Sequence, residues 1–553
     1  MGKKFLFSVF VVLFIAGCGG GGGGDIKIQP TTIDNSVNDS NNTDNGSSGN
    51  NDDDICASYA NSGGQVIQGS ADSDGNCAYS AAFLDAGNVL EVDMTIPALL
   101  NGRAHLFSGS IFVGNNFDTD EGLSGAGISQ GGDGPTLTIE AGATLAFQTS
   151  SDFIIVNRGS QIFAAGTATA PITLTSVSDV NGTVGPEDVQ QWGGMVMNGF
   201  GVTNKCNYVG NRGESGFSTT DCHVAAEGAA GLDTSHYGGD NDADNSGRLE
   251  YVVIKHTGAQ VANGDELNGI SFGGVGSSTI VRNLQVYSTF DDGIEMFGGS
   301  VNFENFVSLY ARDDSIDIDE GWNGTITNAL VIQSETDGNH CIEADGLGSF
   351  SSLTDAEIES KIAQGLNSAP VIINLTCIVS PNGADTATHD PGAGWRLREG
   401  IFPTITDSMI ISAAGVDSSD NNYCLRIDNR SATAAADGDL VLTSNLFACQ
   451  DQSRGDVGAM TVAEWASANG NQFATLTAAT DPTATADTGL VLLEGTPSVY
   501  SVDFSAMVID DSAPSVAAPV SGQIGGVLES ADWAVGWTYG IFDGARAQPL
   551  WFE

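Results

Sequence analysis

Four segments in the middle of the chain decide its fold: NGISFGG at 268–274, DGIEMFGG at 292–299, DSIDIDEG at 314–321 and HCIEADG at 340–346. Their shared isoleucines, at positions 270, 294, 316 and 342, are 24, 22 and 26 residues apart. Each segment is followed by a longer stretch in which apolar and polar residues alternate, as they do in half-buried strands. A repeat of this length fits one coil of a parallel β-helix, whereas a flat β-sandwich does not repeat at a fixed period. The sequence therefore predicts an all-β, right-handed parallel β-helix with coils of about 22–26 residues.

Working outward from these repeats divides the 553 residues into five regions. We predict a lipoprotein signal peptide at 1–17, a lipidated Cys18 with a disordered Gly/Asn/Asp/Ser tether to 54, and an N-terminal cap at 55–135. The β-helix follows at 136–450, and a C-terminal region with a cap occupies 451–553. Residues 347–369 interrupt the repeat, and a helix N-capped by Thr354 is expected in this insertion.

The first eighteen residues predict where the protein is located. Two lysines precede an apolar stretch at 5–16, which is too short to span a bilayer and has the size of a signal-peptide core. The sequence Ile-Ala-Gly-Cys that ends at Cys18 resembles a bacterial lipobox, in which the cysteine is acylated. Gly19 follows, where an Asp would favour inner-membrane retention, so we expect a lipid anchor in the outer membrane and display at the cell surface. An ordinary signal peptide and a periplasmic orientation are the alternatives.

The formal net charge of −51 excludes one class of partner. Such a field repels phosphate backbones, so nucleic acid is not an expected partner. With 41% hydrophobic and 16% charged residues, the chain can still bury a core.

Eight cysteines remain besides Cys18, and they fall into four sequential pairs. Because eight cysteines allow 105 connectivities, nearest-neighbour pairing is a hypothesis that the short loops favour. No CxxC occurs, so a metal cluster is less favoured than disulfides. The predicted pairs are Cys56 with Cys77, Cys206 with Cys222, Cys341 with Cys377 and Cys424 with Cys449.

Several motifs together resemble a group of uncharacterised bacterial secreted and surface lipoproteins. They are TLTIEAGATL at 136–145, NRGSQIFAAGTATAPITLTS at 157–176, HYGGDNDADNSGRLEYVVIKHTG at 236–258, the Asp-Asp segments at 291–302 and 313–324, and DWAVGWT at 532–538. The resemblance covers roughly residues 100–345 and the extreme C-terminus. It implies a right-handed parallel β-helix of the pectate-lyase-like type, and it implies no catalytic residue.

A first candidate site is the acidic loop that contains Asp240, Asp242, Asp244 and Ser246. Alternating carboxylates in a tight loop can converge on Ca²⁺, which takes six to eight oxygen ligands. A solvated acidic turn is the equally weighted alternative.

A second candidate is a ladder of outward side chains on successive coils. In the predicted register these are Ser271, Glu295, Asp317 and Glu343, followed by Arg398 and Arg426, with Asp319 and Asp345 two residues further along. Carboxylates stacked about 4.8 Å apart repel one another and would raise their pKa values or recruit a cation. Pectate-lyase-like enzymes use such acids to hold Ca²⁺ and an Arg or Lys as base. A column of surface side chains with bound ions is the alternative that we favour over catalysis.

Aromatic residues supply a third candidate. Trp322 and Trp395, with Tyr310 and Tyr423 nearby, could present flat faces to sugar rings, although aromatic side chains more often pack in the core.

Two functional classes follow from the sequence. The preferred one is a non-catalytic binding or structural surface protein, with polysaccharide, cations or another surface protein as partner and Ca²⁺ as a possible cofactor. The alternative is a Ca²⁺-dependent polysaccharide lyase or glycoside hydrolase acting on an acidic glycan.

Overall fold

The computed structural model describes residues 55–551, with gaps at 130, 228–234, 263–264, 381–392, 413–422, 449–450, 475–501, 504–522 and 528–531. The predicted signal peptide, Cys18 and the tether therefore lie outside the described residues.

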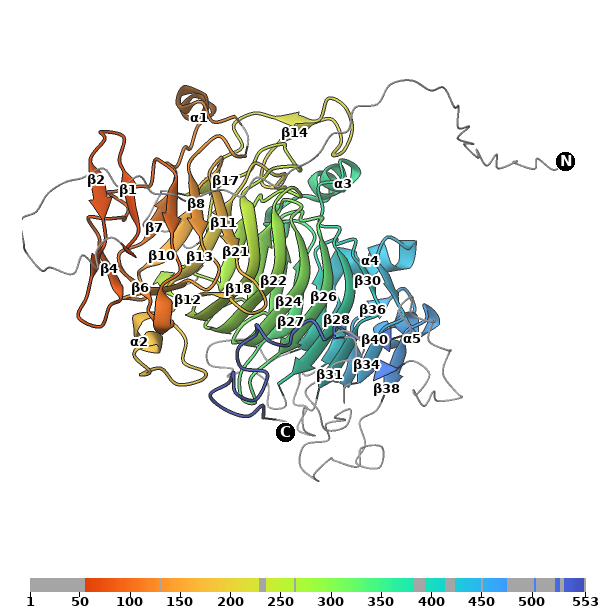
Figure 1. The fold of residues 1–553 in the computed structure, drawn as a ribbon. Coiled ribbons are helices and arrows are strands. Elements are labelled where there is room, and N and C mark those ends of the chain that lie inside the picture. Colours follow the sequence, from red (N-terminus) through yellow and green to blue (C-terminus); the bar gives the residue numbers. More distant parts are fainter. Residues whose placement is uncertain are drawn as a thin grey trace, which may run out of the picture. The chain divides into compact units, whose positions relative to one another are not determined.

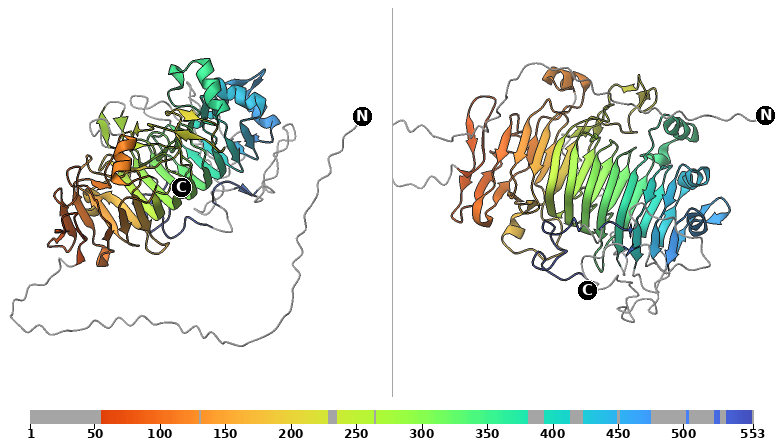
Figure 2. Two further views of the ribbon diagram at one scale, coloured as in Figure 1. Left: turned by 90° about the horizontal axis from the view of Figure 1, so that it is seen from above. Right: turned by 45° about the vertical axis from the view of Figure 1, so that its right-hand side comes forward.

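Two sheets, parallel apart from the antiparallel β3–β4 pair, form the body of the structure, and strands from successive coils lie side by side in both (Figures 1 and 2). One sheet has ten strands of three to six residues each. It consists, in spatial order, of β7 (Ile111–Val113), β10 (Phe153–Val156), β13 (Gly194–Asn198), β21 (Ile270–Gly273), β23 (Ile294–Phe297), β25 (Ile316–Asp319), β27 (His340–Asp345), β29 (Ala393–Arg398), β32 (Tyr423–Ile427) and β35 (Asp451–Arg454).

The second sheet has eighteen strands, and its central members are long. These strands are β3 (Ser70–Ala71), β4 (Cys77–Ser80), β5 (Met94–Ile96), β6 (His105–Ser108), β8 (Thr136–Ile139), β9 (Thr144–Phe147), β11 (Gln161–Ala165), β12 (Ile172–Ser176), β18 (Gly247–Thr257), β22 (Ile280–Thr289), β24 (Asn302–Ala311), β26 (Thr325–Ile332), β28 (Val371–Val379), β30 (Thr404–Thr406), β31 (Met409–Ser412), β33 (Val441–Thr443), β34 (Leu446–Ala448) and β38 (Gln472–Ala474).

The predicted register of the repeat is confirmed. Ile270 pairs with Ile294, Ile294 with Ile316, and Ile316 with Ile342, all in parallel strands. These four isoleucines are fully buried in one continuous apolar core. Because strand side chains alternate between faces, the residue after each isoleucine points away from that core.

Parallel stacking extends beyond the predicted limits of 136 and 450. At the N-terminal end β4 already pairs in parallel with β6, and β7 pairs with β10. At the other end β32 pairs with β35, and β34 pairs with β38. The sequence does not predict the first and last coils, because most of their strands have only three or four residues. Strands this short do not show a clear alternation of apolar and polar residues.

Short helices lie outside the two sheets, and no described helix is long and apolar enough to cross a membrane. They are α1 (Asp120–Ala126), α2 (Val177–Val180), α3 (Asp355–Ala363), α4 (Asn429–Asp437) and α5 (Val462–Ala468). Helix α3 lies in the predicted insertion and begins as predicted: the Thr354 hydroxyl accepts from the Glu357 backbone N–H, and the Glu357 carboxylate accepts from Thr354.

Residues 532–551 pack along the outer face of the eighteen-stranded sheet. Trp537, Ile541 and Leu550 are buried there in a second apolar cluster with Tyr287 and Leu309. The C-terminal segment thus covers part of the outer face of the eighteen-stranded sheet. Most of the predicted site residues lie on the outward-facing side of the ten-stranded sheet.

Candidate functional site: an acidic and basic column

One outward position of the ten-stranded sheet carries charge on six successive strands, and we call it the outer column. Strand pairing places its members in the order Ser271, Glu295, Asp317, Glu343, Arg396, Arg426 and Arg454. Neighbouring parallel strands lie about 4.8 Å apart. Three carboxylates are therefore stacked next to three guanidinium groups.

The structure corrects one member of the predicted ladder. Arg396 follows Glu343 in the outer column, whereas Arg398 pairs with Asp345 two residues further along the strands. The segment WRLREG offers two apolar positions, and the strand aligns Trp395, not Leu397, with Ile342. Arg426 holds its predicted place because it pairs with Arg396.

A second row of acids lines the corner where the chain enters each strand. The Asn268 side-chain oxygen accepts from the Asp292 backbone N–H at 3.1 Å, and the Asp292 carboxylate accepts from the Asp314 N–H at 2.9 Å. Asp314 in turn accepts from the His340 N–H at 2.6 Å. Side chains of successive coils thus stack in register, and Asp292 and Asp314 are held beside the outer column.

Burial and repulsion between neighbouring carboxylates both raise the pKa values of the acidic groups. The pKa values of Glu295, Asp317 and Asp319 are raised well above those of ordinary carboxyls, first by burial and then by neighbouring carboxylates. The same causes raise the pKa values of Asp292 and Asp314. In the described part of the chain, neither Glu295 nor Asp317 forms an ion pair with a basic side chain.

The geometry of these acids suits a divalent cation. Ligand atoms of Asp292, Glu295 and Asp317 lie within 4.8 Å of one another, as do those of Asp314, His340 and Glu343. Ca²⁺ binds oxygen at about 2.3–2.6 Å, so two ligands on opposite sides of one ion are about 5 Å apart. The first of these groups supplies only carboxylate oxygens, the ligands that Ca²⁺ prefers.

The basic half of the column is paired within the chain. Arg396 donates to Glu343 at 2.8 Å, and Arg398 donates to Glu343 at 2.6 Å and to Asp345 at 2.9 Å. These carboxylates raise the pKa of Arg398 above its usual value. Arg426 lies 2.6 Å from Asp428.

A family model matches most of the described β-helix. The model of the pectate-lyase-like β-helix domain matches residues 121–491, which is more than half of the chain. The chain belongs to the pectate-lyase-like β-helix family. No curated protein and no solved structure matches it. Membership of this family supports a carbohydrate-related role.

Other predicted site residues in this family member have structural roles. Trp322 and Trp395 are fully buried in the core, so the prediction that they present exposed faces to sugar rings is wrong. Trp395 occupies the inward position that isoleucine holds on β27, and the Trp322 indole N–H donates to the Val301 carbonyl at 3.1 Å. Their inward positions in the coils, not their aromatic character, determine where they lie.

The acidic loop does not gather its carboxylates. Asp242 forms a bidentate pair with Arg212, with both donor–acceptor distances at 2.7 Å. Asp240 accepts from the Thr219 backbone N–H, and Asp244 is buried and accepts from the Ser246 hydroxyl at 3.1 Å. The predicted convergence of Asp240, Asp242, Asp244 and Ser246 on one ion is therefore wrong, because each carboxylate has a different partner.

The predicted sequential disulfides are present where both cysteines are described. Cys56 bonds to Cys77, Cys206 to Cys222 and Cys341 to Cys377. Cys424 is also disulfide-bonded, and Cys449 lies outside the described residues.

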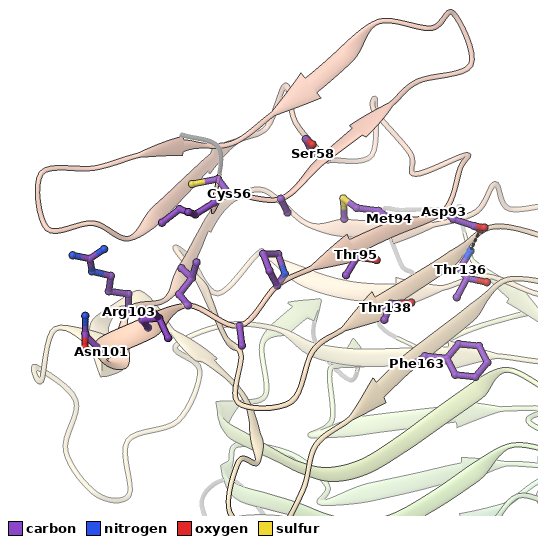
Figure 3. A pocket seen from close by; sticks show the side chains of 16 residues that line it. Cys56, Ser58, Asp93, Met94, Thr95, Asn101, Arg103, Thr136, Thr138 and Phe163 are labelled. Carbon is purple, nitrogen blue, oxygen red and sulfur yellow. Dashed lines mark hydrogen bonds between the residues drawn. The ribbon is translucent and has the colours of Figure 1, made fainter. Parts of the chain in front are cut away.

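A cavity of about 1220 Å³ lies beside the N-terminal coils (Figure 3). Asp93 and Thr136 lie at one end, where the Asp93 carboxylate accepts from the Thr136 N–H at 2.8 Å, and Asn101 and Arg103 lie at the other. No member of the outer column lines this cavity, so it is separate from the charged site.

The predicted ladder lacks part of the acidic group that the structure shows. Asp291, Asp292, Asp313 and Asp314 belong to the family-like segments, but the sequence predicts no ligand role for them. A signal was available, because the two Asp-Asp pairs are 22 residues apart, the same spacing as Ile294 and Ile316.

Proposed function

We propose that the chain is an outer-membrane-anchored, surface-exposed lipoprotein that binds a divalent cation and polysaccharide at the outer column without catalysing a reaction. The observation that carries the proposal is the group Asp292, Glu295 and Asp317, whose ligand atoms lie within 4.8 Å of one another. Desolvated carboxylates at this separation are costly unless protonated or neutralised by a cation. A bound Ca²⁺ would reverse the local sign of charge and allow an acidic glycan to approach.

The arginines favour binding over catalysis. A base that abstracts a proton near neutral pH needs a pKa lowered towards that range. Glu343 and Asp345 do the opposite for Arg398, whose pKa they raise. The guanidinium groups can still donate hydrogen bonds to carboxylate or sulfate groups of a glycan.

A Ca²⁺-dependent lyase or hydrolase is the second candidate function. Glu399 favours it, because burial and the Asp345 charge raise its pKa to about 7, which suits a general acid. This residue directly follows Arg398 at the end of β29.

Glycan binding with and without Ca²⁺ tests the proposal. We expect the full chain to bind an acidic glycan on an array in Ca²⁺ and to lose binding in EDTA. Asp317→Asn should weaken binding at least tenfold, whereas Asp74→Asn, which alters an exposed acid in the N-terminal turn, should leave it unchanged. Glycan binding that is the same with and without Ca²⁺, and the same in wild type and Asp317→Asn, would contradict the proposal.

A product assay separates the two candidate functions. A lyase releases unsaturated uronates that absorb ultraviolet light, and a hydrolase releases reducing ends. We expect neither product from any glycan that binds. Products that Glu399→Gln abolishes would establish the enzymatic alternative.

The predicted anchor has its own test. Cys18→Ser should release the protein from membranes, because without acyl chains no tight attachment remains. Unchanged detergent partitioning would contradict the lipid anchor.

A further inference from the structure

A second group of acids lies at the corner that precedes β23 and β25, and we call Asp291, Asp292 and Asp313 the corner cluster. Their ligand atoms lie within 4.8 Å of one another. Asp291 and Asp292 precede one strand, and Asp313 precedes the next, so the cluster joins two successive coils. Its three ligands are carboxylate oxygens only.

The charges around the cluster are also acidic. Asp313, Glu227, Glu266 and Asp314 all act to raise the pKa of Asp291, after the larger contribution of burial. In the described part of the chain, the Asp291 side chain accepts no hydrogen bond and forms no ion pair. Nothing described therefore neutralises it.

A buried carbonyl oxygen beside the cluster gives an independent indication of a ligand. The Asn339 side-chain N–H donates to the Asp313 carboxylate at 2.8 Å, and its backbone N–H donates to the Asp313 carbonyl at 3.1 Å. These two bonds hold the Asn339 amide against the cluster. Asn339 is only 8% exposed, yet among the described residues its side-chain oxygen has no hydrogen-bond partner. Buried polar atoms are nearly always partnered, and an amide oxygen is a good ligand for a hard cation.

We propose that the corner cluster and the Asn339 side-chain oxygen form a second divalent-cation site, separate from the one on the outer column. Asp292 belongs to both groups of acids, so its carboxylate would bridge two ions. An oxygen-only donor set suits hard cations such as Ca²⁺, Mg²⁺ and Mn²⁺. The inference shares its cation chemistry with the proposed function but does not depend on glycan binding.

The site would act on the fold. A cation held by Asp291, Asp292 and Asp313 would cross-link the turns before β23 and β25, and ligands that bind only the folded state stabilise it. The corner ion would therefore stabilise the fold, and the separate ion on the outer column would be the one that contacts a glycan.

Calcium titration of the metal-free full chain by calorimetry tests the inference. We expect two ions per wild-type chain, one for Asp313→Asn and one for Asp317→Asn. Asp292→Asn should bind neither ion tightly, whereas Asp74→Asn should still bind two. Asparagine at 313 keeps an oxygen that can accept from Asn339, so this variant should fold, and its circular dichroism checks that it does.

Asn339→Ala supplies a second variant that leaves every carboxylate in place. It should weaken one of the two binding events at least tenfold and leave the other unchanged. A single ion per wild-type chain, or stoichiometry and affinity untouched by both Asp313→Asn and Asn339→Ala, would overturn the inference. If glycan binding fails while Asp313→Asn still removes one ion, the proposed function is wrong and the corner site stands.

Discussion

The acidic and basic halves of the outer column share one backbone geometry but differ in how their charges are neutralised. Arg396 and Arg426, on β29 and β32, have carboxylate partners in the chain itself. Glu295 and Asp317, on β23 and β25, face other carboxylates, and burial raises their pKa values. The basic half is thus balanced within the fold, whereas the buried carboxylates of Glu295 and Asp317 are costly unless protons or a cation from outside the chain neutralise them.

Breaking the boundary between the halves should have the largest effect. Arg398 forms ion pairs with both Glu343 and Asp345, whose side chains are only 14% and 13% exposed. Arg398→Met removes this shared partner from both carboxylates. Loss of one partner from a largely buried pair costs about 3–4 kcal/mol. Urea unfolding without divalent cations should show this loss.

Arg430→Met is the matched control for that change. Its partners Asp355 and Glu359 are 93% and 60% exposed. Exposed pairs contribute less than about 1 kcal/mol. Equal losses for the two variants would show that the boundary pairs contribute no more than a surface contact.

Asp244, a buried acid outside the column, shows what burial alone does to the pH dependence of stability. Burial raises the pKa of Asp244 to about 6, and no second carboxylate is among the causes. Because the folded pKa lies above the unfolded one, the stability that Asp244 contributes is present below pH 4 and is lost as the pH rises through about 6. The loss should approach about 3 kcal/mol, at 1.36 kcal/mol per unit.

Asp244→Asn should remove this pH dependence. The difference in the free energy of unfolding between variant and wild type, measured from pH 3.5 to 7.5, should grow over that window. A difference that stays constant with pH would refute the assignment of the raised pKa to Asp244.

Removing one acid should stabilise the acidic half when cations are absent. At about 5 Å each like-charge contact costs around 1 kcal/mol in water. Asp317→Asn should therefore raise the free energy of unfolding in EDTA by at least about 1 kcal/mol. Arg426→Gln in the basic half should lower it by about the same amount, because Asp428 loses the nearer of its two arginine partners and keeps only Arg396 at 3.6 Å. A loss of stability in both variants would contradict the contrast between the halves.

The smallest effect is expected on the other sheet. Arg282 and Glu304 form an outward pair on β22 and β24, but they are 55% and 50% exposed. Arg282→Ala should change the free energy of unfolding by no more than about 0.5 kcal/mol. A larger change would show that exposed charge pairs on adjacent strands also contribute substantially to the free energy of unfolding.

The sequence predicts those parts of the fold and site that a strict period controls. The isoleucine spacing and period-two alternation together place Glu295, Asp317 and Glu343 in one column, because a β-helix stacks equivalent residues. The register fails at Arg398, since 53 residues separate Ile342 from Trp395 and the insertion removes the period. Trp322 and Trp395 could not be assigned to a face from residue type alone. The pairing of Asp242 with Arg212 joins residues 30 apart that no repeat connects.

In the function proposed above, a divalent cation completes the acidic half of the outer column. The most direct test is the melting temperature of the full chain in millimolar Ca²⁺ and in NaCl of equal ionic strength, at pH 7.5. We predict that Ca²⁺ raises the melting temperature well beyond NaCl, and that Asp317→Asn removes a large part of this gain while Asp74→Asn does not. Equal stabilisation of the wild type by Ca²⁺ and NaCl would contradict the claim, because the acids would then respond only to screening.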